Sequence, residues 1–236
     1  MKVTKEILRQ MILDGEDISK LDYSHIADMS YMFCGCKEII ETPLIDTSKV
    51  KHFGNMFSGC KNLKKINKMD LSSAIHLTDM FQDCISLEKV DEIIAPEAKD
   101  LLQMFLGCTL LKVVNYIYAP KSENIIGMFQ DCERLETVRE FDTSSVKFMD
   151  WALSNCKIFR HKKLDWDFSS MENMYKMVEG PETFIKMVGE DRVKDILIDR
   201  AKKMDEFKYK AMTKSLSKEE EKEKLIELVQ YYLIGF

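Results

Sequence analysis

Several features that would indicate membrane insertion, export or nucleic-acid binding are missing from this chain of 236 residues. No apolar run approaches the roughly 18 to 20 residues that a membrane-spanning helix needs. Arg9 and Gln10 interrupt the first apolar stretch before the core of a signal peptide could form. The formal net charge of −5 has the wrong sign for a generic phosphate-binding surface. We therefore expect a soluble, cytoplasmic protein that binds neither a membrane nor nucleic acid.

Signatures of catalysis are absent as well. The 9 glycines form no phosphate-binding loop, and the sequence has neither a nucleophile elbow nor an HExxH motif. The 4 histidines, His25, His52, His76 and His161, are dispersed along the chain. His52 and His76 could stack, but two imidazoles without a third ligand make a poor metal site. We expect no enzyme activity, no cofactor, no metal and no small-molecule substrate.

What the sequence does contain is a repeat of 24 residues, in which Met-Phe is followed three residues later by Cys. Five copies carry this motif, at Met32-Phe33-Cys36, Met56-Phe57-Cys60, Met80-Phe81-Cys84, Met104-Phe105-Cys108 and Met128-Phe129-Cys132. A sixth copy diverges to Ala152-Leu153-Cys156, as is typical near the end of a repeat array. A period of this length indicates a stack of similar units that share one core.

Each copy divides into two parts by its apolar spacing. One part has apolar residues at i, i+3, i+6, i+7 and i+10, as in Val50, Phe53, Met56, Phe57 and Cys60. This spacing predicts a short helix, and Asp46-Thr47-Ser48 ahead of it suits an N-cap or a tight turn. The part from Leu63 to Asn67 is too short for a helix and predicts a strand. Stacked copies would place parallel strands on one face and helices on the other.

The cysteines follow the repeat. Six of the 7 share one position in the repeat, at 36, 60, 84, 108, 132 and 156. This spacing predicts a buried ladder in which each cysteine acts as a small hydrophobic residue and weak donor, rather than a zinc site or a disulfide framework. Cys34 alone lies off the ladder, and we expect a partly exposed thiol whose role the sequence leaves open.

The pattern M-F-x-x-C-x-x-L-x-x-[IV], followed by D-x-S-x-V, resembles the BspA-like leucine-rich repeats of bacterial and mycoplasma surface lipoproteins. The resemblance covers about residues 22–178. It implies an α/β solenoid of leucine-rich-repeat type, here with about six 24-residue strand-turn-helix repeats, and a role in protein interaction. The chain departs from these relatives in having no lipidation cysteine near its start.

The two ends have helical patterns that predict three regions. Residues 1–20 would form an N-terminal cap, in which Thr4 begins a helix that ends at Gly15. Residues 21–180 would form the solenoid, and residues 181–236 a helical extension whose last helix begins with a capping box at Ser217. This extension either covers the last repeat or also binds a partner or a second copy of the chain.

A protein partner would bind where packing does not fix the side chains, on the outer face of the strands. The residues that we expect there are Lys65, Asn67, Lys89, Asp91, Val113, Asn115, Tyr116, Thr137 and Arg139. The leading hypothesis is a non-catalytic interaction module, with an inhibitor of a host complex carried by a phage or mobile element as one variant. A cell-surface adhesin or structural repeat protein is the alternative, and an enzyme is the third.

Overall fold

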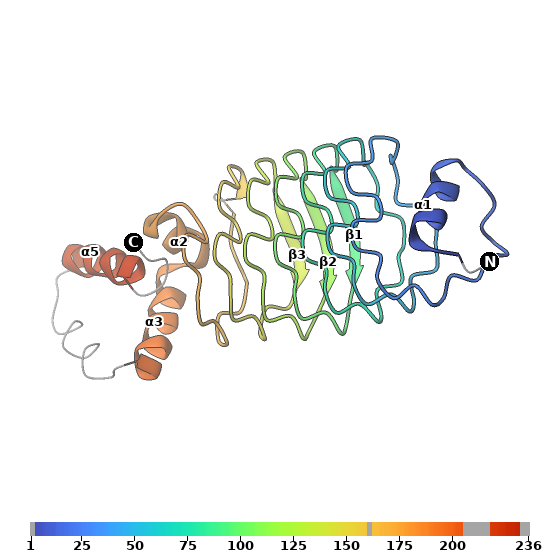
Figure 1. Cartoon of the computed structure of the whole chain (residues 1–236). Coiled ribbons are helices and arrows are strands. Elements are labelled where there is room, and N and C mark those ends of the chain that lie inside the picture. The colour runs from blue at the N-terminus through green and yellow to red at the C-terminus, as the bar shows by residue number, and fades with distance from the viewer. Residues whose placement is uncertain (1–2, 160–161, 205–217, 232–236) are drawn as a thin grey trace.

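The computed structural model describes residues 3–159, 162–204 and 218–231. The chain winds into coils that stack side by side, with helices at both ends of the stack (Figure 1). The helices are α1 (Lys5–Leu13) at one end and α2 (Pro181–Val188), α3 (Glu190–Met204) and α5 (Lys218–Val229) at the other. None of the described helices is long and apolar enough to cross a membrane.

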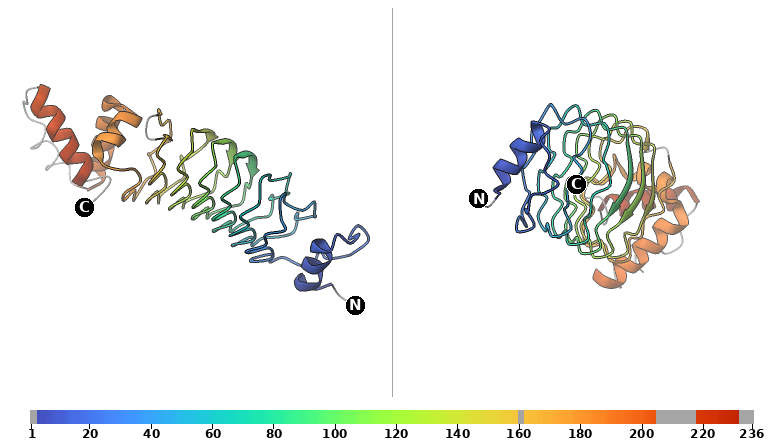
Figure 2. Two further views of the ribbon diagram at one scale, coloured as in Figure 1. Left: turned by 90° about the horizontal axis from the view of Figure 1, so that it is seen from above. Right: turned by 90° about the vertical axis from the view of Figure 1, so that its right-hand side faces the viewer.

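The middle coils contribute one strand each to a small parallel sheet along one side of the stack (Figure 2). The strands are β1 (Lys89–Ile94), β2 (Val113–Tyr118) and β3 (Thr137–Phe141), in the order β1-β2-β3. The strand predicted at Leu63–Asn67 corresponds to residues 87–91 one coil further on. The observed strand β1 begins two residues later and ends three residues later than that prediction. Among the described residues, the sheet joins three coils and is not closed.

A second line of contacts runs through all the coils. Isolated parallel bridges connect Asp28 with His52, His52 with His76, His76 with Asp100, Asp100 with Asn124, Asn124 with Phe148 and Phe148 with Asn173. The partners are 24 residues apart except in the last bridge, where 173 − 148 gives 25. One extra residue therefore enters the chain after the sixth cysteine, which the sequence pattern did not reveal.

The predicted helix within each copy is wrong. The segment from Val50 to Cys60 is a series of tight turns, and its N–H groups alternate between two kinds of acceptor. The Met56 N–H donates to the Phe53 carbonyl of the same coil (3.0 Å), and the Phe57 N–H donates to the Met80 carbonyl of the next coil (2.9 Å). Asn55 has a positive φ of 56°, which no α-helix contains. The apolar spacing of a helix also fits this ladder of turns, because both bury every third or fourth side chain.

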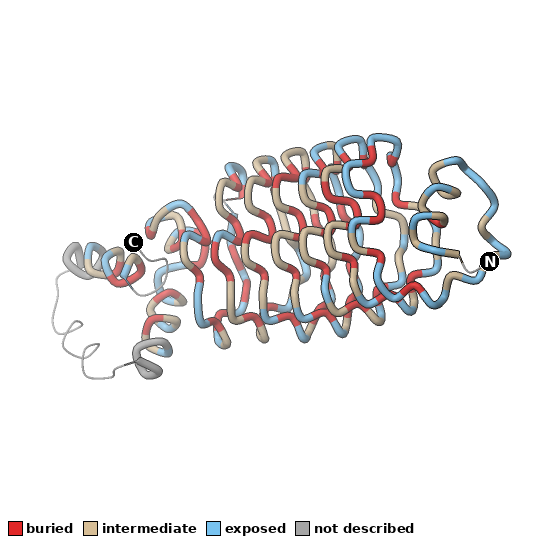
Figure 3. Tube along the Cα trace, viewed as in Figure 1, coloured by how far each residue is buried: buried red, intermediate tan, exposed pale blue. Residues whose placement is uncertain are grey.

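The core is built from repeated side chains, and buried positions recur from coil to coil (Figure 3). The rings of Phe33, Phe57, Phe81, Phe105 and Phe129 are nearly parallel, with centroids 5.4 to 5.7 Å apart. Each cysteine from the second copy on donates its thiol hydrogen to the phenylalanine carbonyl of the coil before, as Cys60 does to Phe33 (3.0 Å). Burial raises the pKa of Cys60 to about 12, so that its thiol stays neutral. The predicted cysteine ladder is confirmed.

Helices cover both ends of this core. The Thr4 hydroxyl accepts a hydrogen bond from the Ile7 N–H (3.3 Å) and caps α1, as predicted. At the other end, the ring of Phe184 from α2 lies 5.6 Å from that of Phe168 in the last coil. Arg192 from α3 donates to the carbonyl of Leu164 (2.9 Å). The predicted capping box at Ser217 lies outside the described residues.

Candidate interaction surface

The strands give the stack an outer face whose positions are fixed by their inner residues. Val90 and Val114 are completely buried, so the residues on either side of them point outward. The register aligns Lys89 with Val113 and Thr137, and Glu92 with Tyr116 and Glu140. Seven of the predicted contact residues therefore lie on β1, β2 and β3.

Several of these residues already bind one another. The Lys89 ammonium lies 2.6 Å from the Asp91 carboxylate, and the Asn115 amide donates to the same carboxylate (3.3 Å). The hydrogen bond from Lys89, aided by its charge and by Asn115, holds the pKa of Asp91 below its ordinary value. Arg139 is exposed and takes part in no ion pair within the described chain. The face therefore presents one ordered polar cluster beside a free cation.

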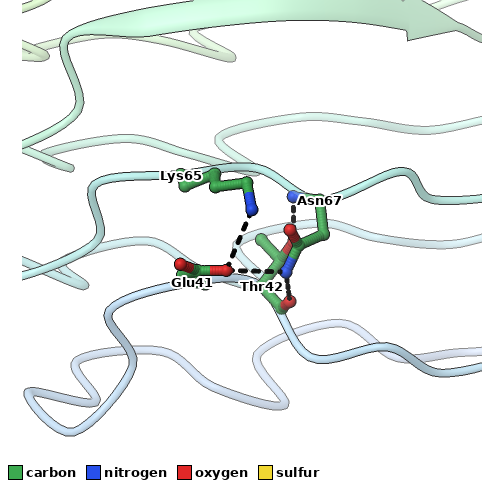
Figure 4. Close-up of polar contacts among 4 residues, drawn as sticks. All are labelled: Glu41, Thr42, Lys65 and Asn67. Carbon is green, nitrogen blue, oxygen red and sulfur yellow. Dashed lines mark hydrogen bonds and ion pairs between the residues drawn. The ribbon is translucent and has the colours of Figure 1, made fainter.

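Lys65 and Asn67 lie in the coil before β1 and outside the sheet, contrary to our expectation. Lys65 pairs with the Glu41 carboxylate (3.2 Å), which also accepts a hydrogen bond from the Asn67 amide (3.3 Å; Figure 4). The Asn67 N–H donates to the Thr42 hydroxyl (2.8 Å), and its amide donates to the Thr42 carbonyl (2.7 Å). Asn67 thus connects its coil to the preceding one.

Two exposed apolar residues belong to this face and were missed. Ile94 and Tyr118 are adjacent in the register and have 40% and 43% of their surface exposed. The ring of Tyr118 lies 6.4 Å from that of Tyr116 in a stacked arrangement. The sequence pattern did not reveal them because the predicted strand stopped about three residues too early.

Salt bridges between neighbouring coils cover other parts of the surface. They follow the repeat, with a lysine 24 residues after a glutamate, in the pairs Glu41–Lys65, Glu88–Lys112, Glu97–Lys121, Glu123–Lys147 and Glu133–Lys157. All are solvent-exposed, so each contributes about 0 to 1 kcal/mol to stability. The spacing was visible in the sequence and would have identified these pairs.

Other clusters of reactive side chains offer little chemistry. The His52 and His76 rings stack with centroids 5.3 Å apart. No group of three side chains that could hold a metal ion occurs in the part of the chain that the structure describes, from which His161 is excluded. Cys34 is exposed, as expected, whereas the six ladder cysteines are buried. The outer face of the sheet is therefore the best-defined candidate site.

Comparisons with known proteins identify a family but no individual relative. The family described as "Mycoplasma protein of unknown function, DUF285" matches twice, over residues 4–117 and 99–217. Searches of curated proteins and of solved structures find no match. The double match agrees with the repeated ladder of phenylalanine and cysteine side chains. Because the two matches together span most of the sequence, the chain belongs to this mycoplasma family of unknown function.

Proposed function

We propose that the chain is a non-catalytic repeat protein that binds a protein partner through the outer face of β1, β2 and β3. In this proposal the stacked coils are a solenoid of leucine-rich-repeat type related to the BspA-like repeats, with about six 24-residue copies. The observation that carries the proposal is the exposed pair Ile94 and Tyr118, which extends the stacked Tyr116 ring. The matching family is described as of unknown function, which does not conflict with an interaction role.

The composition of this face supports the proposal. Tyrosine and arginine are enriched among the residues that contribute most to binding at protein interfaces, usually within a polar rim. Tyr116 and Tyr118 would form the anchor, and the free Arg139 would form part of the rim. The cluster of Lys89, Asp91 and Asn115 is already ordered, so that binding would immobilise few further side chains.

The proposal is tested by affinity capture from the native cells with two matched variants. The face variant combines Tyr118→Ala, Lys89→Glu and Arg139→Glu. The control combines Lys51→Glu and Lys99→Glu, two exposed residues away from the strands that form no ion pair within the described chain. We expect the wild type and the control to recover the same protein and the face variant to lose it. Equal recovery by all three would exclude this face.

The C-terminal helices and the location of the protein enter the proposal separately. Leu225, Leu228 and Val229 of α5 are buried, which supports a covering role for this helix over a role in pairing two copies.

The alternative of a surface adhesin is favoured by the resemblance to surface-protein repeats. Detection of the protein on intact cells with an antibody would support that alternative over a cytoplasmic location. The mobile-element inhibitor stays a prediction.

A further inference from the structure

The stack of coils is open along one edge of β1. Within the described chain, no backbone hydrogen bond joins residues 64–72 with residues 88–95, although β2 pairs with the other edge of β1. On its other side the coil of residues 64–72 is bound to the coil before it, since the Asn67 N–H and the Asn67 amide both donate to Thr42. The coil around Asn67 therefore belongs to one side of a seam, which we define as the gap between residues 64–72 and β1, and β1 forms the other side. β1 presents an unpaired strand edge at this seam.

A groove of about 450 Å³ lies between β1 and the preceding coil. It is lined by Ile45, Ile66, Asn67, Lys68, Met69, Asp70, Leu71, Ser72, Phe81, Glu92, Ile93 and Ile94. Its apolar walls are only partly covered: Ile66 is half-buried, whereas Val90 and Val114, at the same repeat position, are completely buried. Both the free strand edge and the apolar wall are features that proteins usually pair or cover.

The charges around the groove favour a basic occupant. Lys68, Asp70 and Glu92 line it, giving two carboxylates and one ammonium group. The negative charge of Asp46 also acts on Asp70, but this further carboxylate is itself accompanied by the ammonium group of Lys49. Neither Lys68 nor Glu92 forms an ion pair within the described residues. The net charge of this rim is therefore negative.

We propose that this groove binds an extended peptide segment that adds a strand to the free edge of β1. The peptide backbone would supply the hydrogen bonds that the preceding coil does not make, which is the basis of recognition by strand addition. An apolar side chain would contact Ile66 and Met69, and a lysine or arginine beside it would face the carboxylates. The site adjoins the outer face of the sheet, with which it shares Ile94, but it does not depend on binding there.

A labelled peptide with capped ends that copies residues 112–118 is a suitable probe, because it is mostly apolar, carries one lysine and contains the strand β2 of this protein. Its affinity for the whole chain is measured by fluorescence anisotropy. The Met69→Gln variant makes the groove wall polar, and we expect it to weaken binding at least about fivefold. The Lys68→Glu variant makes the rim more negative and should strengthen binding about twofold to fivefold.

Backbone methylation separates strand addition from simple apolar contact. Two versions of the probe are made, one with N-methyl groups on the odd-numbered residues and one with them on the even-numbered residues. In an extended peptide, alternate N–H groups point to opposite edges, so each version loses the hydrogen-bond donors of one edge only. We expect one methylated peptide to lose binding and the other to keep it, and any other result would overturn strand addition. Equal binding of the probe to wild type, Met69→Gln and Lys68→Glu would exclude the groove.

The remaining outcomes distinguish this inference from the proposed function. The face variant without its Lys89→Glu substitution should bind the probe within about twofold of wild type, since Tyr118 and Arg139 lie on β2 and β3 and do not line the groove. Loss of the probe in this variant alone would assign the peptide to the sheet face and overturn the groove proposal. A dimer in sedimentation that disappears in Met69→Gln would identify a second copy of the chain as the occupant, which also overturns it.

Discussion

The thiol of Cys108 donates a hydrogen bond to the carbonyl of Phe81, 3.1 Å away in the preceding coil. The same arrangement joins Cys84 with Phe57 and Cys132 with Phe105. Each thiol therefore links two coils through the backbone, in addition to filling space in the core. Burial raises the pKa of these thiols well above the ordinary range, so that the donor hydrogen is kept.

Cys108→Ala should lower the free energy of unfolding by about 1 to 3 kcal/mol. The substitution leaves a small cavity at a completely buried position and removes the hydrogen bond to Phe81. Cys34→Ala is the matched control, and its effect should stay within about 0.5 kcal/mol because Cys34 is exposed. Urea denaturation measures both. Similar losses in the two variants would contradict the role of the ladder.

Alkylation should separate Cys34 from the other thiols. A thiol reacts as its thiolate, and burial both shields the ladder cysteines and raises the pKa of Cys60 to about 12. We expect iodoacetamide to modify Cys34 alone in the native protein and all 7 cysteines after denaturation. Mass spectrometry of tryptic peptides reads out each site. Rapid native modification of Cys84 or Cys132 would show that the ladder opens.

Asp79→Asn should stabilise the protein at neutral pH. Burial, reinforced by nearby Asp100, raises the pKa of Asp79, and one of its carboxylate oxygens is buried without a hydrogen bond. Its charged form therefore opposes folding above this raised pKa, and the penalty disappears as the pH falls through it. We expect a higher melting temperature for Asp79→Asn at pH 7 and a smaller difference near pH 4. Asparagine tolerates the positive φ of 55° at this position.

Asp46→Asn provides the control with the opposite sign. The Ser48 N–H donates to the Asp46 carboxylate and lowers its pKa in the folded protein. The stability that this interaction contributes is present above the unfolded pKa of about 3.9 and is lost as the pH falls through the folded pKa. Asp46→Asn should therefore lower the melting temperature at pH 7 and have less effect near pH 3. If both aspartate variants shifted stability in the same direction, the assignment would be wrong.

Tyr31→Asn should stabilise the protein by about 0.5 to 1 kcal/mol. Tyr31 has a φ of 61°, which strains its backbone. Because 64% of its surface is exposed, burial of its side chain contributes little stability to offset this strain. Asn55 occupies the equivalent position of the next coil with a φ of 56°. Tyr31→Ala is the control, because alanine meets the same steric penalty at positive φ and should bring no gain. Thermal unfolding of the three proteins decides between these outcomes.

Much of the candidate site could be predicted from the sequence. The outward positions of Lys89, Asp91 and Asn115 follow from the buried Val90 and Val114, and that of Arg139 from the half-buried Val138, because side chains of neighbouring strand residues point to opposite faces. The partners of these residues could not be predicted in the same way. Asn67 donates hydrogen bonds to Thr42 and lies outside the sheet. This choice of partner depends on how the two neighbouring coils pack against each other.

The sequence by itself determined which residues form the core. Phe105 and Cys108 are buried because five successive 24-residue copies place the same apolar side chains at the same points, and the free energy gained by removing an apolar side chain from water depends on the residue type. Only the tertiary structure decided the path of the backbone between them. The Phe57 N–H needs an acceptor, and a helix would provide one four residues earlier, whereas here the acceptor is Met80 in the next coil. Apolar spacing does not distinguish these two acceptors, because it records which side chains are buried and not where the backbone hydrogen bonds go.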